Sequence, residues 1–216
     1  MRYSKVLSQL AAVLLLLVMA GCANVGSKKS KDKTDDTKEE GVEIPFVLIP
    51  NPYVPGTVPE PAKREYTTIK GLMSEKKWAQ AKGLLNLMVE TYPNLSGPYI
   101  NLGIVHHILG EHEQAEKALN FAIETNPNNL DAYARLGFLY RELGRFSDAE
   151  ATYLKALAIW PHHLASTRNL GILYDLYMGR FDDALRYYQL SQKITGGEDR
   201  ELKGWIVDLQ RRMKTP

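Results

Sequence analysis

A repeat of 34 residues is the feature that most limits what this chain can fold into. Three prolines stand 34 residues apart, at Pro93, Pro127 and Pro161. The same offset relates residues of matching type in the segments before the last two prolines: Tyr99 and Tyr133, Leu102 and Leu136, Gly103 and Gly137, Gly110 and Gly144, Ala115 and Ala149, Ala122 and Ala156. Units of this length cannot bury a core alone, so they must stack on their neighbours.

Each unit predicts two helices joined by a turn, because its apolar residues recur three and four positions apart. Gly110 and Gly144 fall between the two helices, where a left-handed residue ends the first of them. Gly137 and Ala149 fall where we expect the paired helices to approach closely and face each other, since larger side chains there would push the helices apart. The proline that follows each second helix ends it.

The unit length, the Leu-Gly pair, the alanines and the closing proline resemble the tetratricopeptide repeat (TPR), a helix-turn-helix unit. The resemblance implies an all-α fold, a TPR superhelical solenoid of four repeats and a C-terminal capping helix, with nine helices in all. We assign the repeats to residues 62–95, 96–129, 130–163 and 164–197, and the capping helix and tail to 198–216.

The first and last repeats depart from the pattern, as terminal repeats do. The first has Ile69 and Lys76 where later repeats have glycine. In the last, the second half is shifted by one, so we expect one extra residue near Tyr177 and Met178. The segment after Gly196-Gly197 places apolar residues on one face of a helix, as a cap requires: Leu202, Trp205, Ile206, Leu209 and Met213.

The N-terminus has the pattern of an export signal that ends at the only cysteine. Arg2 and Lys5 precede an apolar run over 10–20, which is about half the roughly 20 residues that span a bilayer. Ala20-Gly21-Cys22 resembles the lipobox of bacterial lipoproteins. The resemblance implies a lipoprotein signal peptide at 1–21, acylation of Cys22 (palmitate among the chains) and a membrane anchor. Because Ala23 rather than Asp follows the cysteine, it further implies the outer membrane, facing the periplasm, if the source is Gram-negative.

A tether of two compositions, residues 22–61, joins this cysteine to the repeats. Residues 23–43 are nearly all polar and predict disorder. Residues 44–61 contain six prolines, which favour an extended spacer and exclude a helix. Yet the strip at 44–55 is rich in apolar residues, which would be a liability in water. It therefore either docks on the repeats, where it stabilises them or occludes their groove, or binds a partner.

No constellation for catalysis or for a cofactor occurs in the sequence: there is no phosphate loop, no His-Glu-x-x-His and no nucleophile elbow. His106 and His112 fall at helix-packing positions, and His162-His163 falls in a loop, so we expect no metal site. After removal of the signal the chain has 25 basic and 25 acidic residues, which argues against a nucleic-acid partner. We expect a non-enzyme without cofactors or a small-molecule substrate.

The TPR resemblance also implies a partner-binding groove, lined by one face of each first helix. Carried onto this chain, the groove residues are Tyr66, Lys70, Met73, Ile100, Ile104, His107, Ala134, Phe138, Arg141, Arg168, Ile172 and Asp175. Ile104, Phe138 and Ile172 recur at 34 and would form an apolar ladder for a peptide or helix. Asn101 and Arg135 match part of the set that grips a terminal carboxylate in some TPR proteins, but Tyr66 and Asp131 replace its lysines. We therefore expect Asn101 to cap or bridge helices.

These features predict a membrane-anchored TPR scaffold that binds a protein partner and assists an envelope complex, in the manner of the pilotin-like lipoproteins of secretins and pili. Two alternatives remain open at this point. One is an accessory subunit of an ion-driven envelope transport or motor system. The other is an adaptor for cell-wall hydrolases or proteases.

Overall fold

The computed structural model describes residues 46–53 and 56–214. The expected signal peptide at 1–21, the expected lipidation site Cys22 and the charged part of the tether lie outside the described residues. No helix within 46–53 or 56–214 is long and apolar enough to cross a membrane.

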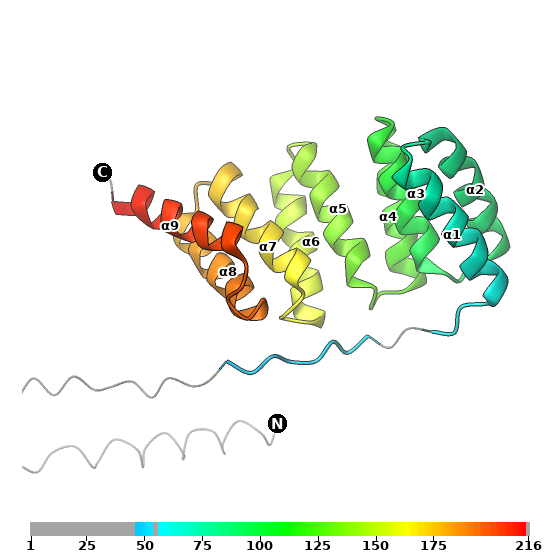
Figure 1. The fold of residues 1–216 in the computed structure, drawn as a ribbon. Helices are drawn as coiled ribbons and strands as arrows, with labels where there is room; N and C mark the ends of the chain where they lie inside the picture. The colour runs from blue at the N-terminus through cyan, green and yellow to red at the C-terminus, as the bar shows by residue number, and fades with distance from the viewer. Residues whose placement is uncertain (1–45, 54–55, 215–216) are drawn as a thin grey trace, which may run out of the picture. The chain divides into compact units, whose positions relative to one another are not determined.

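The described residues form nine α-helices and one π-helical segment, with no strand among them (Figure 1). Their bounds are α1 Glu60–Ser74, α2 Trp78–Thr91, α3 Ser96–Ile108, α4 His112–Thr125, α5 Leu130–Glu142, α6 Phe146–Ile159, α7 Leu164–Ile172, the π segment Leu173–Tyr177, α8 Phe181–Ile194 and α9 Arg200–Lys214. The all-α fold class and the helix count expected from the repeat are confirmed.

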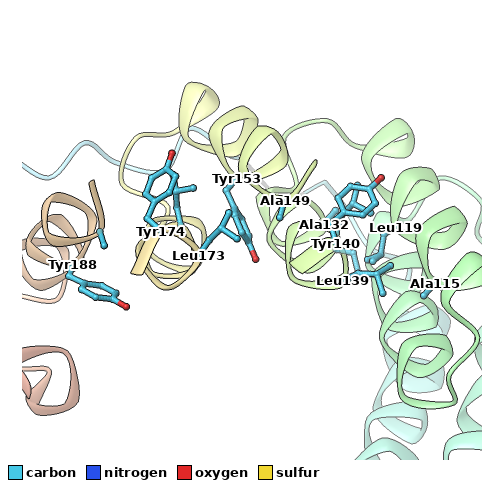
Figure 2. Packing of buried hydrophobic residues seen from close by; sticks show 14 of the residues in the cluster. Ala115, Leu119, Ala132, Leu139, Tyr140, Ala149, Tyr153, Leu173, Tyr174 and Tyr188 are labelled. Carbon is cyan, nitrogen blue, oxygen red and sulfur yellow. The ribbon is translucent and has the colours of Figure 1, made fainter. Parts of the chain in front are cut away.

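Successive helices pack in pairs, α1 with α2, α3 with α4, α5 with α6 and α7 with α8, and α9 packs on α8. The buried side chains of the larger core cluster form a row that passes from one pair to the next rather than a single centre (Figure 2). Leu202 and Leu209 of α9 are fully buried at the end of this row. The helix expected to cap the last repeat therefore covers its apolar face, as repeat arrays require.

Close approach within a pair depends on glycine, as the sequence suggested. A Cβ added to Gly137 would lie 2.5 Å from Cε1 of the Tyr153 ring. Three atoms of that ring, and none of Ala149, are the nearest neighbours of the added carbon. Gly137 thus faces a buried aromatic ring on α6, which is the neighbour that most closely limits the size of its side chain. Ala149 is itself fully buried in the same core cluster.

The turns between paired helices use the left-handed region, as expected for Gly110 and Gly144. Their φ angles are +76° and +74°. In the first repeat Lys76 takes the place of the turn glycine and still adopts a φ of +59°. A side chain is disfavoured in this region because its Cβ approaches the following carbonyl oxygen.

Replacing Lys76 with glycine is therefore expected to raise the free energy of unfolding by about 1 kcal/mol. The reciprocal change, Gly110→Lys, is expected to lower it by a similar amount. No atom lies within 4 Å of a Cβ added at Gly110, so only the backbone conformation is tested there. Chemical denaturation followed by circular dichroism measures both variants. Changes of the same sign in the two would contradict the explanation.

The fourth repeat holds its extra residue as a π segment. Residues Leu173–Tyr177 are π-helical, and Met178 donates its backbone N–H to the Leu173 carbonyl oxygen at 3.1 Å. A π segment accommodates one inserted residue without ending the helix. The one-residue shift expected near Tyr177 and Met178 is confirmed.

The array begins two residues earlier than the sequence suggested. Helix α1 starts at Glu60, so Pro61, which we had assigned to the tether because proline excludes a helix, lies in its first turn. Proline is tolerated there because the N–H groups of a first turn have no intrahelical partner. The preceding Val58 already packs against the core cluster of the first repeats.

A segment of the tether contacts the array at the loop between α6 and α7. We call residues 46–53 the strap; in Figure 1 it runs along the side of the array where α6 ends and α7 begins. The Ile49 N–H donates to Nδ1 of His162 at 2.8 Å, and Trp160 Nε1 donates to the Ile49 carbonyl oxygen at 2.7 Å. The sequence left open whether the apolar strip docks on the repeats or binds a partner. Its described residues dock on the repeats.

Candidate protein-binding face

Eleven of the twelve expected groove residues lie on the first helices α1, α3, α5 and α7, and Asp175 lies on the π segment. Eight are exposed or half-buried: Tyr66, Lys70, Met73, Ile104, His107, Phe138, Arg168 and Ile172. The other four are buried: Ile100, Ala134, Arg141 and Asp175. The expectation that all twelve offer a binding surface was too broad, since these four are engaged in packing or ion pairing. The pattern of groove positions indicates which face of each first helix to consider, but not how much of that face the side chains of adjacent helices bury.

The centre of this face is an apolar hollow between α3 and α5. A cavity of about 40 Å³ is lined by Ile104, His107 and Phe138, with Arg135 beside them. Ile104 and Ile172 also pack against the core cluster. Two neighbouring members of the expected ladder, Ile104 and Phe138, are thus brought together around one small hollow.

The Phe138 ring is held in place by two side chains, His107 of α3 and Arg141 of its own helix α5. His107 meets it edge-on, with ring centroids 5.7 Å apart and planes at 90°. The Arg141 guanidinium lies 4.9 Å from its centroid and 5.7 Å from that of Tyr177, so the cation contacts two aromatic faces. Arg141 also donates to Oδ1 of Asn169 at 3.1 Å. These contacts fix the position of Phe138, which reduces the entropy lost when a ligand packs on it.

Burial lowers the pKa of His107, and the nearby His112 adds to the effect. The His112 ring lies 5.5 Å away and is exposed, contrary to the packing position expected for it. A histidine with a lowered pKa is neutral in the folded state at a pH where the unfolded chain is already protonated. Above the unfolded pKa of about 6.5, His107 is neutral in both states and does not favour unfolding. As the pH falls from there toward the folded pKa, the unfolded chain takes up a proton that the folded protein does not, so the free energy of unfolding decreases.

We therefore expect the stability of the protein to fall on acidification below pH 6.5, and His107→Gln to make that fall less steep. Urea denaturation at a series of pH values measures the slope, and an NMR titration of His107 gives its pKa directly. An unchanged slope in the variant would show that His107 is not a source of the dependence.

Asn101 bridges helices, as expected, and is not available to a ligand carboxylate. Its Nδ2 donates to the Tyr66 hydroxyl at 2.7 Å and to the Gly97 carbonyl oxygen at 2.8 Å. Asp131, which stands where carboxylate-binding relatives have lysine, lies 3.5 Å from Nε2 of His163. The hydrogen bond from His163 lowers the pKa of Asp131 and keeps it ionised. A negative charge at this place disfavours an anionic ligand.

A larger pocket lies beside α1, and part of its wall was not identified from the sequence. It has a volume of about 590 Å³ and includes Tyr66 and Lys70 from the expected groove. The segment before α1 completes it with Tyr53, Gly56, Thr57 and Val58. The apolar residues among the prolines of the tether indicated that this segment docks on the repeats. They did not indicate that it lines a pocket beside α1.

Ion pairs between repeats were also missed, although their 34-residue offset is visible in the sequence. Glu116 accepts from the Tyr140 hydroxyl at 2.8 Å and from Arg145 at 2.7 Å, and burial together with Glu116 raises the pKa of Tyr140 to about 12. The next boundary repeats this arrangement, with Glu150, Tyr174 and Arg180. At the first boundary the charges are reversed: Lys82 takes the place of Glu116, and Glu111 takes the place of Arg145.

Within the part of the chain that is described, no cluster of three or more His, Cys, Asp or Glu side chains could hold a metal ion. His162 and His163, expected in a loop, are buried there and have protein partners. The described face offers apolar surface, aromatic rings and a few cations, which suits contact with a polypeptide.

The comparisons with known proteins agree with this architecture. The sequence model of the tetratricopeptide repeat matches residues 94–161 and 128–195. No curated protein sequence matches the chain significantly.

Several solved structures share the fold at low sequence identity. One is a structure of pilF from Pseudomonas aeruginosa, at 20% identity over 72% of this chain and 70% of that chain, with a TM-score of 0.65. A second is a thermophilic TPR protein from Thermus thermophilus, at 24% identity over 70% and 82%, with a TM-score of 0.63. A third is YrrB, described as a TPR protein with an unusual peptide-binding site, at 20% identity over 65% and 71%, with a TM-score of 0.53. The repeat match over 94–195 and the paired helices identify a tetratricopeptide repeat array in this chain, and these structures share its fold.

Proposed function

We propose that this protein is a non-catalytic, lipid-anchored scaffold that binds a protein segment along the face of α3 and α5 that carries Ile104, His107 and Phe138. The observation that carries the proposal is the Phe138 ring, held between His107 and Arg141 beside an apolar hollow. A pre-positioned aromatic side chain next to a cation is typical of the residues that dominate the energy of protein interfaces. A peptide or helix with an apolar side chain fits this surface better than an anionic terminus, because Asp131 lies nearby and Asn101 is occupied.

The lipobox at Ala20-Gly21-Cys22 supports an anchor through Cys22, in the outer membrane of a Gram-negative cell and facing the periplasm. We further propose that the scaffold assists the assembly of an envelope complex of the secretin or pilus type. The fold shared with pilF is consistent with this role. The peptide-binding site named for YrrB is consistent with a peptide ligand.

A photoreactive amino acid at Ile104 tests the binding face in cells, because Ile104 lines the hollow and is only half-buried. We expect a discrete cross-linked partner whose yield drops at least ten-fold with Phe138→Glu. Phe121→Glu is the matched control, because Phe121 on α4 is 54% exposed and lies away from the hollow. Equal loss in both variants, or in neither, would contradict binding at this face.

Replacing Cys22 with serine tests the anchor separately. We expect the variant to move from the membrane fraction to the soluble fraction while its helix content stays that of the wild type. If the variant sediments with membranes as the wild type does, the lipid on Cys22 is not the anchor.

A further inference from the structure

The loop between α6 and α7 forms hydrogen bonds with the main chain of a single residue of the strap. Both polar groups of the Ile49 backbone are bonded, the N–H to His162 and the carbonyl oxygen to Trp160. The Phe46 ring lies against the same imidazole, with centroids 5.0 Å apart. His162 is 7% exposed, so its acceptor nitrogen is set in the body of the array rather than on a mobile surface side chain.

Apart from Phe46, the apolar side chains of the strap add little to this contact. Val47 is 72% exposed, and Leu48 and Ile49 are about half exposed. The specific bonds are therefore to the backbone, as when a peptide is bound in extended form and its main chain supplies affinity. The prolines around this segment limit its freedom before docking, which reduces the entropy lost on binding.

We propose that Trp160 and His162 form a binding site for an extended peptide backbone, that its occupant is the strap of this chain, and that the tether therefore leaves the array at the α6–α7 loop rather than at α1. The last part, the exit point of the tether, rests on the proposed lipid anchor at Cys22, which holds the other end of the tether. From Phe46, 23 residues lead back to Cys22, compared with 37 if the chain were held only from Glu60 onward. At about 3.5 Å per residue, docking shortens the greatest reach from roughly 130 Å to roughly 80 Å.

The same segment ties the attachment of the tether to the candidate binding face. Tyr53, next to the docked residues, lines the pocket of about 590 Å³ together with Tyr66 and Lys70. Asn94 and Asn129, from the loops before α3 and α5, line it as well. A strap released from Trp160 and His162 would take one wall of this pocket with it. Docking of the strap thus sets both where the membrane pulls on the array and whether that pocket is complete.

The Trp160 indole N–H reports docking directly in a nitrogen–proton correlation spectrum of the lipidated full chain in detergent micelles. Ile49→Pro removes the donor to His162, and His162→Phe removes the acceptor while keeping a ring beside Phe46. In both variants we expect the docked-to-free ratio to fall about five-fold, from the loss of one hydrogen bond, and the indole resonance to move toward its free position. Leu48→Pro is the matched control, because the structure gives the Leu48 N–H no partner, and its indole resonance should stay in place.

A paramagnetic lipid headgroup in nanodiscs then locates the exit of the tether. We expect amides of the α6–α7 loop to relax more than those of the α1–α2 turn in the wild type, and the difference to vanish with Ile49→Pro. An indole resonance that Ile49→Pro leaves unmoved, or that Leu48→Pro moves equally, would overturn the backbone site. A moved resonance with an unchanged relaxation pattern would overturn the exit point. A wrong assignment of the anchor gives a different result. In that case the amides of Cys22→Ser would show the same paramagnetic relaxation as those of the wild type, while the Trp160 indole resonance would still report docking of the strap.

Discussion

Replacing Gly137 with alanine is expected to destabilise the array by about 2 kcal/mol. The added Cβ would lie 2.5 Å from the ring of Tyr153, which has no exposed surface into which it could move. Overpacking of this kind costs about 1–3 kcal/mol, which outweighs the gain of up to about 1 kcal/mol from the better helix propensity of alanine. Gly171 meets Tyr188 in the same way at 2.7 Å, so its alanine variant is expected to behave alike.

Gly83→Ala is the matched control for this prediction. Gly83 lies within α2, and nothing lies within 4 Å of a Cβ added there. Only the propensity term remains, so this variant is expected to be more stable than the wild type by up to about 1 kcal/mol. Urea denaturation followed by circular dichroism should shift the two midpoints in opposite directions. Shifts in the same direction would show that the close approach at Gly137 is relieved by movement of the helices.

Much of the fold could be predicted because the information is periodic. Gly110 and Gly144 mark the turns between paired helices, and the one-residue shift was sufficient to locate the extra residue near Tyr177, although not its π-helical conformation. Such inferences need only local spacing and the stacking of equal units.

The rest depended on contacts between residues far apart in sequence. Whether Arg141 is exposed or buried depends on Asn169 and Tyr177, which come from the next repeat. The strap finds its site more than 100 residues away, at Trp160 and His162. A 34-residue pattern says which positions are equivalent but not which side chain a neighbour places against them.

Asp175 illustrates the difference and leads to the prediction with the other large effect. The groove pattern placed it on the binding face, but its side chain is 5% exposed and pairs with Arg212 of the capping helix at 2.6 Å. The Tyr188 hydroxyl donates to its second oxygen at 3.2 Å. Arg212 also lies 5.3 Å from the Phe181 ring, so this one side chain joins α9 to both α8 and the π segment.

Arg212→Ala is therefore expected to destabilise the protein by about 2–3 kcal/mol, because it leaves a buried carboxylate with Tyr188 as its remaining partner. The double variant Arg212→Ala with Asp175→Asn should recover part of this loss, since the buried charge is removed as well. Lys203→Ala, on an exposed position of α9, is the control and should change stability by less than about 0.5 kcal/mol. Urea denaturation followed by tryptophan fluorescence measures the loss, and Trp205 contributes to the signal from the capping end because its ring lies 5.6 Å from that of Tyr188. A double variant no more stable than Arg212→Ala would mean that the lost packing on Phe181, and not the buried charge, causes the effect.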